Sequence, residues 1–491
     1  MHGREKSDPA IVAKKPANNA GPPAAERVER RAGTEGNAGQ QSTRRAQDRD
    51  SVSQALERVR QAAKQRRKER FTALFHHINS AMLRTAFFAL KRDAAAGVDG
   101  MTWQDYEADL DRRIEDLRDR VHRGAYRAQP SRRRYIPKPD GRQRPLAVAA
   151  LEDKVVQRAT TALLNAIYEE EFLGFSYGFR PGRGQHDALD ALHVGIDSRK
   201  VNHILDADIA GFFDAVSQDW LIRFVEHRIG DPRIIRLIRK WLKAGVLEDG
   251  VVTTSEWGTG QGSVISPLLA NIYLHYVFDL WAARWRRHQA RGNVVLVRYA
   301  DDIVAGFEHQ ADAERFQADL RDRLAQFALT LHPDKTRLLQ FGRRAAEERE
   351  RAGLGKPETF DFLGFTHICA KSRNGRFWLK RITISKRMRA KLKAVKDQLK
   401  RRMHQPIPEQ GRWLAAVVRG HMAYYAVPGN YEAVAAFCDQ LTRYWLKVLR
   451  RRSQKTRTDW TRMIRIRKRW LPPVRVMHPF PEARFAATHP R

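Results

Sequence analysis

The sequence has 491 residues and carries 91 Lys and Arg against 56 Asp and Glu, which gives a formal net charge of +35. Such an excess exceeds what solubility requires and indicates a polyanionic partner, most directly a nucleic acid. Only two cysteines occur, which excludes a disulfide scaffold or a cysteine-rich zinc module and fits a reducing cytoplasm. No run approaches the ~20 apolar residues of a membrane-spanning helix, and we expect no signal peptide and no membrane partner.

The beginning of the chain differs in composition from the rest. Residues 1–52 mix Pro, Gly, Ala, Asn, Gln and charged residues with almost no large apolar ones. Such a segment buries too little to offset chain entropy, so we expect a disordered, basic N-terminal extension. From Ser53 the pattern becomes helical. The basic cluster at 64–68 is either a solvated helix face or an RNA contact.

Residues 132–146 predict a β-hairpin, because Pro-Asp-Gly at 139–141 is a turn sequence between two strand-like arms. Lys138 and Arg144 lie on opposite arms of this hairpin. Across a tight turn they can hold one polyphosphate, the Arg bidentately and the Lys as a point charge. Basic hairpins also occur without such a ligand.

Two further stretches carry a signal. The first has the composition of a nucleic-acid contact, and the second has that of a strand. Residues 176–184 are rich in Gly and Arg with interleaved aromatics, which suits either a nucleic-acid contact or an ordinary loop. Residues 203–207 form an apolar strand that ends at Asp208. Immediately after it, Gly211 and the aromatic pair at 212–213 break the pattern.

The apolar runs 294–297 and 303–307 predict two strands that meet at a turn containing Asp301 and Asp302. Adjacent carboxylates repel each other, and apolar surroundings disfavour their charged forms. Asp is also a good turn former, which is the alternative interpretation. Because the strand at 203–207 also ends in a carboxylate, Asp208 and Asp301 can meet across a sheet and hold divalent cations such as Mg²⁺.

The remaining patterns predict two helices, one that follows a Gly-rich turn and one that has a basic surface. Residues 258–274 predict a Gly-rich turn that leads into an apolar helix, whose N-terminal N–H groups a substrate can approach. From Ser385, apolar residues recur at helical spacing, and we expect Ser385 to cap this helix. Between 386 and 402 the other faces carry nine Lys or Arg and one acid, Asp397, a surface suited to a nucleic-acid duplex.

These motifs resemble those of the reverse transcriptases, or maturases, that bacterial group II introns encode, and the match is colinear from about Phe71 to about Trp460. The sequences that carry the resemblance are Tyr-Ala-Asp-Asp at 299–302, Gln-Gly-Ser-Val-Ile-Ser-Pro-Leu-Leu-Ala-Asn-Ile-Tyr-Leu at 261–274, and Arg-Gly-His-Met-Ala-Tyr-Tyr at 419–425. The chain departs from the usual family pattern at 147–149, where Gly-Ile-Pro is common, and at Gly260 and Ser263, where Pro and Gly are common.

The resemblance implies a role for each candidate site residue. Asp208, Asp301 and the backbone carbonyl of Ile209 would bind two Mg²⁺ ions, and Asp302 would complete the carboxylate triad. Lys138, Arg144 and Gln261 would bind the incoming nucleotide. Phe213 would lie beneath its sugar and exclude a 2′-hydroxyl. Lys335 would protonate the leaving pyrophosphate, although a solvated surface lysine is the alternative there.

The fold implied is α+β, a right-hand polymerase with fingers and an antiparallel palm sheet, followed by an α-helical thumb. The expected domains are the extension at 1–52, fingers and palm at 53–370, and a thumb/maturase domain that binds RNA at 371–460. A short basic tail at 461–491 would follow, without an endonuclease domain, because no cysteine occurs after Cys438.

The function implied is that of an RNA-directed DNA polymerase, a nucleotidyltransferase of a mobile element in the bacterial cytoplasm. Its partners would be an intron RNA template, a DNA primer or target and deoxynucleotide triphosphates, and it would assist RNA splicing and retromobility. Two alternatives remain: an RNA-binding splicing cofactor without polymerase activity, and a related reverse transcriptase recruited to host defence or repair. The three clustered carboxylates argue against the first. Intron RNA domains beside the gene would decide the second.

Overall fold

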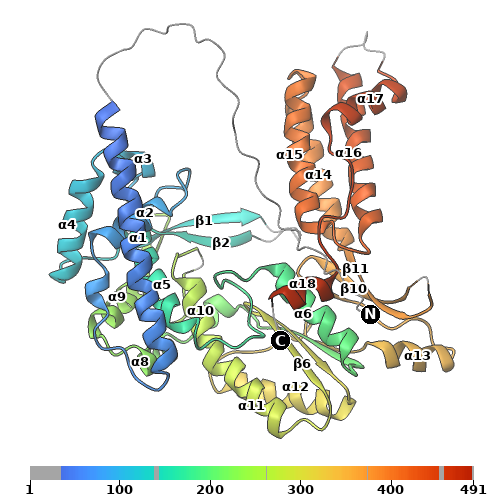
Figure 1. The fold of residues 1–491 in the computed structure, drawn as a ribbon, viewed down its shortest axis with the longest axis horizontal. Coiled ribbons are helices and arrows are strands. Elements are labelled where there is room, and N and C mark those ends of the chain that lie inside the picture. The colour runs from blue at the N-terminus through green and yellow to red at the C-terminus, as the bar shows by residue number, and fades with distance from the viewer. Residues whose placement is uncertain (1–34, 138–142, 261, 373, 453–457, 489–491) are drawn as a thin grey trace, which may run out of the picture. The chain divides into compact units, whose positions relative to one another are not determined.

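The structure is a computed structural model that describes residues 35–137, 143–260, 262–372, 374–452 and 458–488 (Figure 1). The chain divides into two compact units, Met1–Gln47 and Asp48–Arg491. Of the first unit, residues 35–47 are described, and they are helical. The account below concerns the second unit unless it says otherwise.

The helices of the N-terminal half are α1 Glu35–Gln65, α2 Ser80–Phe88, α3 Trp103–Glu107, α4 Leu110–His122, α5 Leu151–Tyr168, α6 Gln185–Ser198, α7 Phe212–Ala215, α8 Gln218–Arg228 and α9 Pro232–Lys243. Those that follow are α10 Ser266–Leu274, α11 Leu280–His288, α12 Gln310–Ala325, α13 Arg343–Arg351, α14 Ser385–Arg401, α15 Ile407–Tyr425, α16 Tyr431–Arg451, α17 Trp460–Trp470 and α18 Pro481–Thr488. A short 3₁₀ helix, η1, covers Phe75–His77, and a π-helical turn, η2, covers His275–Asp279 between α10 and α11.

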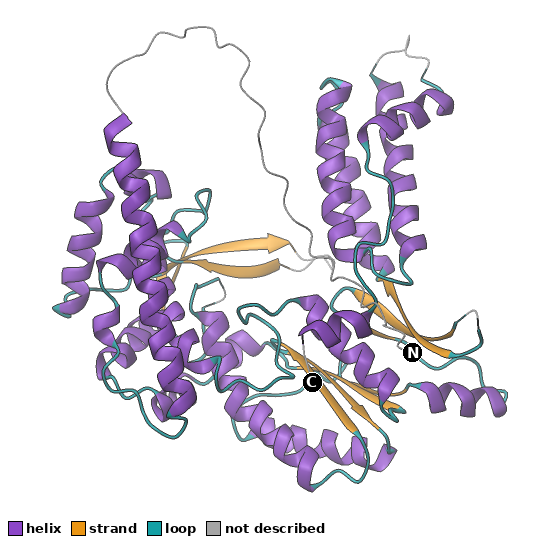
Figure 2. Cartoon of the chain, in the orientation of Figure 1, coloured by secondary structure: helices purple, strands orange, loops and turns teal. Residues whose placement is uncertain are grey.

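The strands form three separate sheets, drawn in orange in Figure 2. A four-stranded sheet has the order β6-β7-β3-β8, with β6 Val294–Tyr299, β7 Asp302–Phe307, β3 His203–Asp208 and β8 Arg337–Gln340. A second has the order β2-β1-β4-β5, with β2 Gln143–Val148, β1 Ser131–Pro137, β4 Val246–Glu248 and β5 Val251–Thr253. A third has the order β11-β10-β9, with β11 Phe377–Thr383, β10 Phe365–Lys371 and β9 Phe360–Phe362.

The predicted strands are confirmed. The apolar runs at 203–207 and 294–307 form β3, β6 and β7, and every pairing in their sheet is antiparallel. The predicted hairpin at 132–146 forms β1 and β2, which pair antiparallel, while its tip at 138–142 lies outside the described residues. Mixed helices and antiparallel strands thus agree with the predicted α+β class.

Helix α1 differs from the sequence prediction, because residues 35–52 belong to it rather than to a disordered extension. Its second half supplies the reason. Val52, Val59 and Ala63 are buried in the core of the second unit, and Asp48 forms an ion pair of 2.8 Å with the buried Arg84. These contacts stabilise the later turns of α1, so the helix is already nucleated there. Nucleation is the unfavourable step of helix formation, and the residues before these turns only extend an existing helix. Residues 1–34 lie outside the described residues.

Three apolar clusters make up the core of the second unit. The first joins the helices before β3 to α8–α12 and to one face of the four-stranded sheet. The second fills the space between the opposite face of that sheet, α6 and the β9–β11 sheet. The third is the interior of a bundle formed by α14–α17. The strands that carry the candidate carboxylates therefore lie between two packed layers.

The end of the chain also differs from the prediction. The bundle core includes Met463 and Leu471, which lie beyond residue 460, where we expected a tail to begin. Helix α18 then packs on α6, where Glu482 contacts His193 at 3.1 Å and Arg484 pairs with Asp190 (Figure 1). Amphipathic spacing at 460–471 explains the first of these differences, and buried charges that meet only in the fold explain the second.

Two smaller findings concern the helices. Helix α14 begins at Ser385 as predicted, but its N-cap residue is Ile384 and no side chain caps it, so the predicted Ser385 cap is wrong. A cap must precede the first helical residue, whereas Ser385 is itself the first. In the described part of the chain, no helix combines the length and the apolarity that a membrane span requires.

Candidate active site

The structure brings Asp208 and Asp302 together. Asp208 ends β3, Asp302 begins β7, and the two residues are direct partners in the antiparallel ladder. Residues opposite one another in such a ladder project their side chains to the same face of the sheet, with Cα atoms about 4.5–5.5 Å apart. The sheet thus brings two candidate carboxylates together, but the paired residues are Asp208 and Asp302, whereas we predicted that Asp208 and Asp301 would meet across the sheet.

Asp301 lies in the two-residue turn that joins β6 to β7, because Tyr299 and Asp302 are paired on either side of it. The other turn residue, Ala300, has a φ of 57°. A positive φ at the first central position of a tight hairpin is usually supplied by Gly, so Ala300 stores backbone strain. This turn is held tightly, since a Cβ on Gly178 would lie 2.2 Å from the Ala300 nitrogen.

The carboxylates are electrostatically unfavourable in the folded chain. Burial and the neighbouring Asp208 raise the pKa of Asp301, while Arg144 and Lys335 partly offset this. Burial, followed by repulsion from Asp301 and Asp208, raises the pKa of Asp302 to about 7. Asp302 is also exposed on one side, so water moderates the effect. The positive charge near these carboxylates is therefore too small to offset their mutual repulsion.

Lys335 is the one predicted catalytic cation that the structure places directly against a carboxylate, since its ammonium group donates to Oδ2 of Asp208. It follows the loop in which Leu331 bridges to Ile209, just before β8. Half of the Lys335 side chain remains exposed, at 53%. The ammonium group thus lies beside Asp208, and the predicted role of Lys335 as a proton donor remains a prediction.

The backbone of Ile209 is oriented by an isolated bridge to Leu331. Ile209 and Leu331 form an antiparallel bridge whose hydrogen bonds come from the flanking groups: His332 N–H donates to the Asp208 carbonyl at 2.7 Å, and Ala210 N–H donates to the Thr330 carbonyl at 2.8 Å. In such a pair the polar groups of the central residue point away from its partner. The Ile209 carbonyl therefore points away from Leu331 and toward the side of β3 on which β7 lies.

The two phenylalanines after Asp208 have different environments. Phe212 is buried, whereas Phe213 is half-buried and packs edge-on against it at 5.4 Å. The Phe213 carbonyl accepts a hydrogen bond of 2.8 Å from Thr259 N–H, which ties it to the Gly-rich turn. The Phe212 ring thus belongs to the core, whereas the Phe213 ring remains partly exposed.

Of the predicted nucleotide-binding residues, Arg144 is described and two are not. Arg144 lies opposite Ile136 near the tip of the β1–β2 hairpin, is exposed, and is close enough to Asp301 to lower its pKa. Lys138 and Gln261 lie outside the described residues. The predicted clamp by Lys138 and Arg144 therefore remains a prediction.

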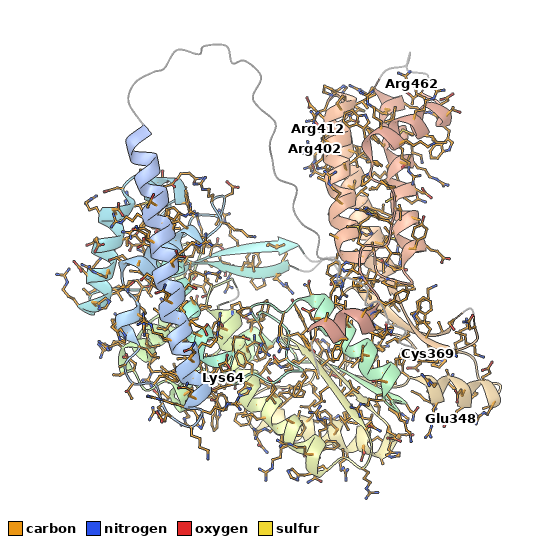
Figure 3. The ribbon with its side chains drawn as sticks, viewed as in Figure 1. Lys64, Glu348, Cys369, Arg402, Arg412 and Arg462 are labelled. Atoms are coloured by element: carbon orange, nitrogen blue, oxygen red, sulfur yellow. The ribbon has the colours of Figure 1, made fainter. Side chains whose placement is uncertain are left out.

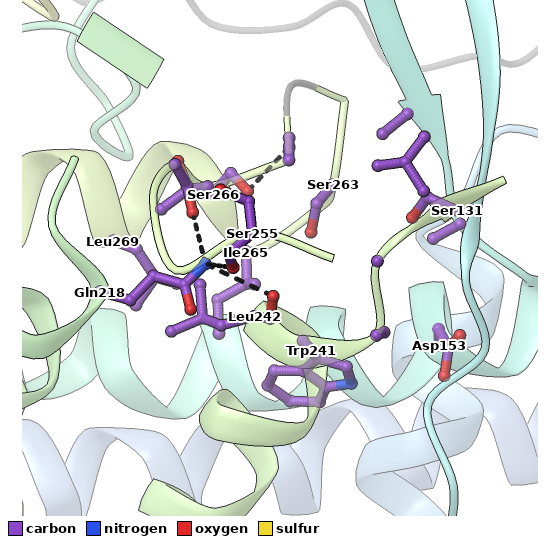
Figure 4. Close-up of a pocket in the computed structure, with 18 of the residues that line it drawn as sticks. Ser131, Asp153, Gln218, Trp241, Leu242, Ser255, Ser263, Ile265, Ser266 and Leu269 are labelled. Carbon is purple, nitrogen blue, oxygen red and sulfur yellow. Dashed lines mark hydrogen bonds between the residues drawn. The ribbon is translucent and has the colours of Figure 1, made fainter. Parts of the chain in front are cut away.

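The Gly-rich turn before α10 is held by the amide side chains of the buried Gln157 and the half-buried Gln218. Oε1 of Gln157 accepts hydrogen bonds from Ser263 Oγ at 2.8 Å and from Val264 N–H at 3.0 Å. Gln218 donates to the carbonyls of Ser255 and Gly258 at 3.0 and 3.1 Å (Figure 4). A cavity of about 230 Å³ lies behind this turn, between it and the β1–β2 sheet, and the three candidate carboxylates do not line it.

The carboxylates fit hard divalent cations. Mg²⁺ usually binds one or two protein carboxylates and keeps its other positions for water and substrate phosphates. In the described part of the chain, no group of three or more His, Cys, Asp or Glu is placed so that it could hold a metal ion. Asp208 and Asp301 instead offer an incomplete ligand set, and raised carboxylate pKa values are what a cation would reverse.

Comparison with known proteins identifies the family. A family model described as reverse transcriptase (RNA-dependent DNA polymerase) matches residues 136–367. Protein YkfC of Escherichia coli (strain K12) is 34% identical over 296 residues, which cover 52% of this chain and 77% of YkfC. Group II intron-encoded protein LtrA of Lactococcus lactis subsp. cremoris is 33% identical over 222 residues, which cover 45% of this chain and 37% of LtrA. This chain belongs to the group II intron reverse transcriptase/maturase family.

A more distant relative is nuclear intron maturase 3, mitochondrial, of Arabidopsis thaliana, which is 27% identical over 138 residues covering 27% of this chain and 18% of the maturase. The family prediction made from the motifs is confirmed. The matched region contains the four-stranded sheet and its carboxylates, so the reverse transcriptase domain of this family member has the mixed α/β content of a polymerase. Domains of this kind act with divalent metal ions.

A second candidate surface is the bundle α14–α17 of this family member. On α14, eight of the nine basic residues between 386 and 402 are exposed, while Leu392, Val395 and Leu399 pack inward. Figure 3 shows further arginines along the bundle, among them Arg412 and Arg462. The predicted separation of an apolar stripe from a basic surface is present.

Sequence reasoning missed the residues that support the catalytic turn. Arg298 has 0% exposed side chain and lies directly before the Tyr-Ala-Asp-Asp motif. One signal was available, since this arginine directly follows the apolar run at 294–297. The side chains that it contacts, however, lie 19 to 122 residues away in the chain, where no local pattern connects them to it.

Proposed function

We propose that this chain is an RNA-directed DNA polymerase of a group II intron that also binds the intron RNA and assists its splicing and mobility. The observation that carries the proposal is the pairing of Asp208 with Asp302 across β3 and β7, with Asp301 in the adjoining turn. A protein that only bound RNA would gain nothing from clustered carboxylates that face a polyanion.

In this proposal each residue of the site has one task. Asp208, Asp301 and the Ile209 carbonyl hold two Mg²⁺ ions, and Asp302 keeps the site negative. When bound, the ions activate the primer 3′-hydroxyl and neutralise the charge that develops on the leaving pyrophosphate. Lys335 delivers a proton to that pyrophosphate.

A second set of residues would bind the incoming nucleotide. Arg144 and Lys138 bind its triphosphate, and Gln261 lines its pocket. Phe213 restricts the space at the sugar, so that deoxynucleotides are selected over ribonucleotides. The half-buried Phe213 ring and the exposed Arg144 side chain, which is close enough to Asp301 to lower its pKa, support this arrangement.

We further propose that the β6-β7-β3-β8 sheet is the palm, that the β1–β2 hairpin belongs to the fingers, and that α14–α17 form the thumb. The exposed basic residues of α14 support the last assignment, because contacts between cations and phosphates supply affinity without sequence preference. The intron RNA, a DNA primer and deoxynucleotide triphosphates are the expected partners.

The deciding experiment is primer extension on an RNA template with Mg²⁺ and deoxynucleotides, comparing the wild type with Asp301→Ala. We expect extension by the wild type, none by the variant, and equal RNA affinity in both. Splicing of the intron RNA is then measured with the same variant, which should retain it. A wild type that binds RNA tightly but extends nothing would favour the splicing cofactor instead.

A further inference from the structure

The guanidinium group of Arg298 is the centre of a buried network beneath the catalytic turn. Its side chain is fully buried, and it makes five hydrogen bonds to four residues. An arginine has five N–H donors, so none is left over. The family assignment does not explain why so completely satisfied a cation lies next to the carboxylates.

The strongest bonds run to Asp279. Nε of Arg298 donates to Oδ1 at 2.7 Å and Nη2 donates to Oδ2 at 2.6 Å, a bidentate pair with both side chains 0% exposed. Asp279 ends the π-helical turn η2, which interrupts the helix running from α10 into α11. A π turn adds a residue to the helical register and so redirects the side chains that follow it. The wider turn thus accompanies the meeting of Asp279 with Arg298.

Other bonds of Arg298 reach the turn itself. Nη1 donates to the carbonyl of Ala300 at 3.0 Å, which fixes the strained residue immediately before Asp301. A strained backbone conformation persists only where its surroundings hold it in place. Arg298 therefore determines the direction in which the chain leaves β6 toward the two aspartates.

The network also extends to the loop at 175–178. Nη2 of Arg298 donates to Ser176 Oγ at 2.7 Å, and the Arg298 backbone bonds to Phe175 and Tyr177 at 2.8 and 2.9 Å. Asn271 of α10 accepts a hydrogen bond from Nη1 at 3.1 Å through Oδ1 and donates one to the Gly178 carbonyl at 2.7 Å through Nδ2. Gly178 in turn packs directly against Ala300.

We propose that Arg298, with Asp279 and Asn271, is a positioning unit for nucleotidyl transfer. It holds Asp301 and Asp302 in register with Asp208 and couples their turn to the loop at 175–178 and to the helix that follows the Gly-rich turn. The inference rests on the proposed polymerase function. A lysine in place of Arg298 keeps the charge but has three donors on one nitrogen, so it cannot satisfy Asp279, Asn271, Ser176 and Ala300 together.

The test measures single-nucleotide extension under single-turnover conditions, normalised to active sites, beside primer–template affinity measured by fluorescence anisotropy. For Arg298→Lys we expect the extension rate per active site to fall ~100-fold, as a displacement of about 1 Å at a reacting centre would cause. Primer–template affinity should stay within about twofold, because no residue of the network lies on the exposed basic surface. Asn271→Ala removes one link only and should cost about tenfold.

Arg228→Lys is the matched control. Arg228 is likewise buried and donates to the carbonyls of Ala63 and Arg66 at 3.1 and 2.7 Å, but it bonds to no residue of the catalytic turn. Both lysine variants should unfold at lower temperature, and Arg298→Lys alone should lose extension. If Arg298→Lys or Asn271→Ala extends at the wild-type rate per active site, the inference is wrong and the network is only structural. A wild type without extension would instead overturn the proposed function.

Discussion

In the β6-β7-β3-β8 sheet, acidic side chains gather where strands end, whereas the α14–α17 bundle spreads basic side chains along exposed helix faces. Burial and the neighbouring carboxylates raise the pKa values of Asp301 and Asp302. The bundle cations are surrounded by water, and few of them pair with acids. The arrangement of charges is therefore electrostatically unfavourable in the sheet but not in the bundle.

This difference separates two demands on a polymerase. Holding metal ions requires a few oxygen atoms in fixed places, so each carboxylate is indispensable and the backbone around it must be rigid. Holding a duplex requires many weak contacts to phosphates, so single residues are replaceable. The comparison predicts large effects of single substitutions in the sheet and small, salt-dependent ones in the bundle.

The largest expected effect is that of Asp208→Asn. The amide keeps the shape of the side chain but removes a charged oxygen ligand, so the extension rate should fall about 10³-fold or more. Primer–template affinity, measured by anisotropy, should change by less than about threefold, because removing a negative charge does not weaken phosphate binding. If Asp208→Asn extended primers at half the wild-type rate, the prediction that single substitutions in the sheet have large effects would be wrong.

Lys335→Met should have the next largest effect. Lys335 contacts Asp208, and loss of a general acid in this position should lower the extension rate ~100-fold. Lys335→Arg keeps the charge and should lose less than Lys335→Met. If the wild type and Lys335→Met had equal single-turnover extension rates, Lys335 would be a surface lysine without a catalytic role.

Asp302→Asn should reveal the stability cost of the crowded carboxylates in the absence of metal. In EDTA the folded chain keeps a proton on Asp302 up to about pH 7, whereas the unfolded chain releases it near pH 4. The free energy of unfolding contributed by Asp302 is therefore highest below pH 4 and is lost as the pH rises through 7.

The complete shift corresponds to about 4 kcal/mol, and solvent screening of this exposed carboxylate reduces the expected loss to on the order of 1 kcal/mol. Urea unfolding at pH 5 and pH 8 measures it. The wild type should lose more stability than Asp302→Asn over this interval, and Mg²⁺ should restore part of the loss at pH 8. Identical pH dependence in the two proteins would show that Asp302 is not strained.

The smallest effect is expected in the bundle. Lys393 is exposed on α14, so Lys393→Gln should weaken primer–template affinity about threefold and lower the slope of log Kd against log salt by about 1. Its rate at saturating primer–template should equal that of the wild type. Lys356→Gln, an exposed lysine outside the bundle, is the control and should change neither quantity. A tenfold loss from Lys393 alone would mean that the bundle also works through a few fixed contacts.

Much of the fold and of the site could be predicted because the signals are local. Runs of apolar residues place β3, β6 and β7, and Asp208 and Asp302 lie at the ends of two of these runs. Helical spacing after residue 385 likewise separates the buried from the basic face of α14. The family resemblance then supplied roles for residues that position alone left open.

Other features depended on contacts between distant segments. Residues 35–52 lack the apolar content of a stable helix, yet they continue α1 because later turns of that helix are buried. Composition describes a segment by itself, whereas helix extension depends on what the neighbouring turns contact. The packing of α18 on α6 has the same origin, since Asp190 and Arg484 meet only in the folded chain.

By itself, therefore, the sequence determined the family, the strands that carry Asp208, Asp301 and Asp302, and the basic face of the bundle, because each depends on residue type and short-range spacing. Only the tertiary structure decided that Arg298 meets Asp279 and Asn271 beneath the turn, and that Lys335 pairs with Asp208. The physical reason is that a buried charge is tolerated only with its partners in place. Those partners come from a π-helical turn, a helix and a loop that the chain brings together only when it folds.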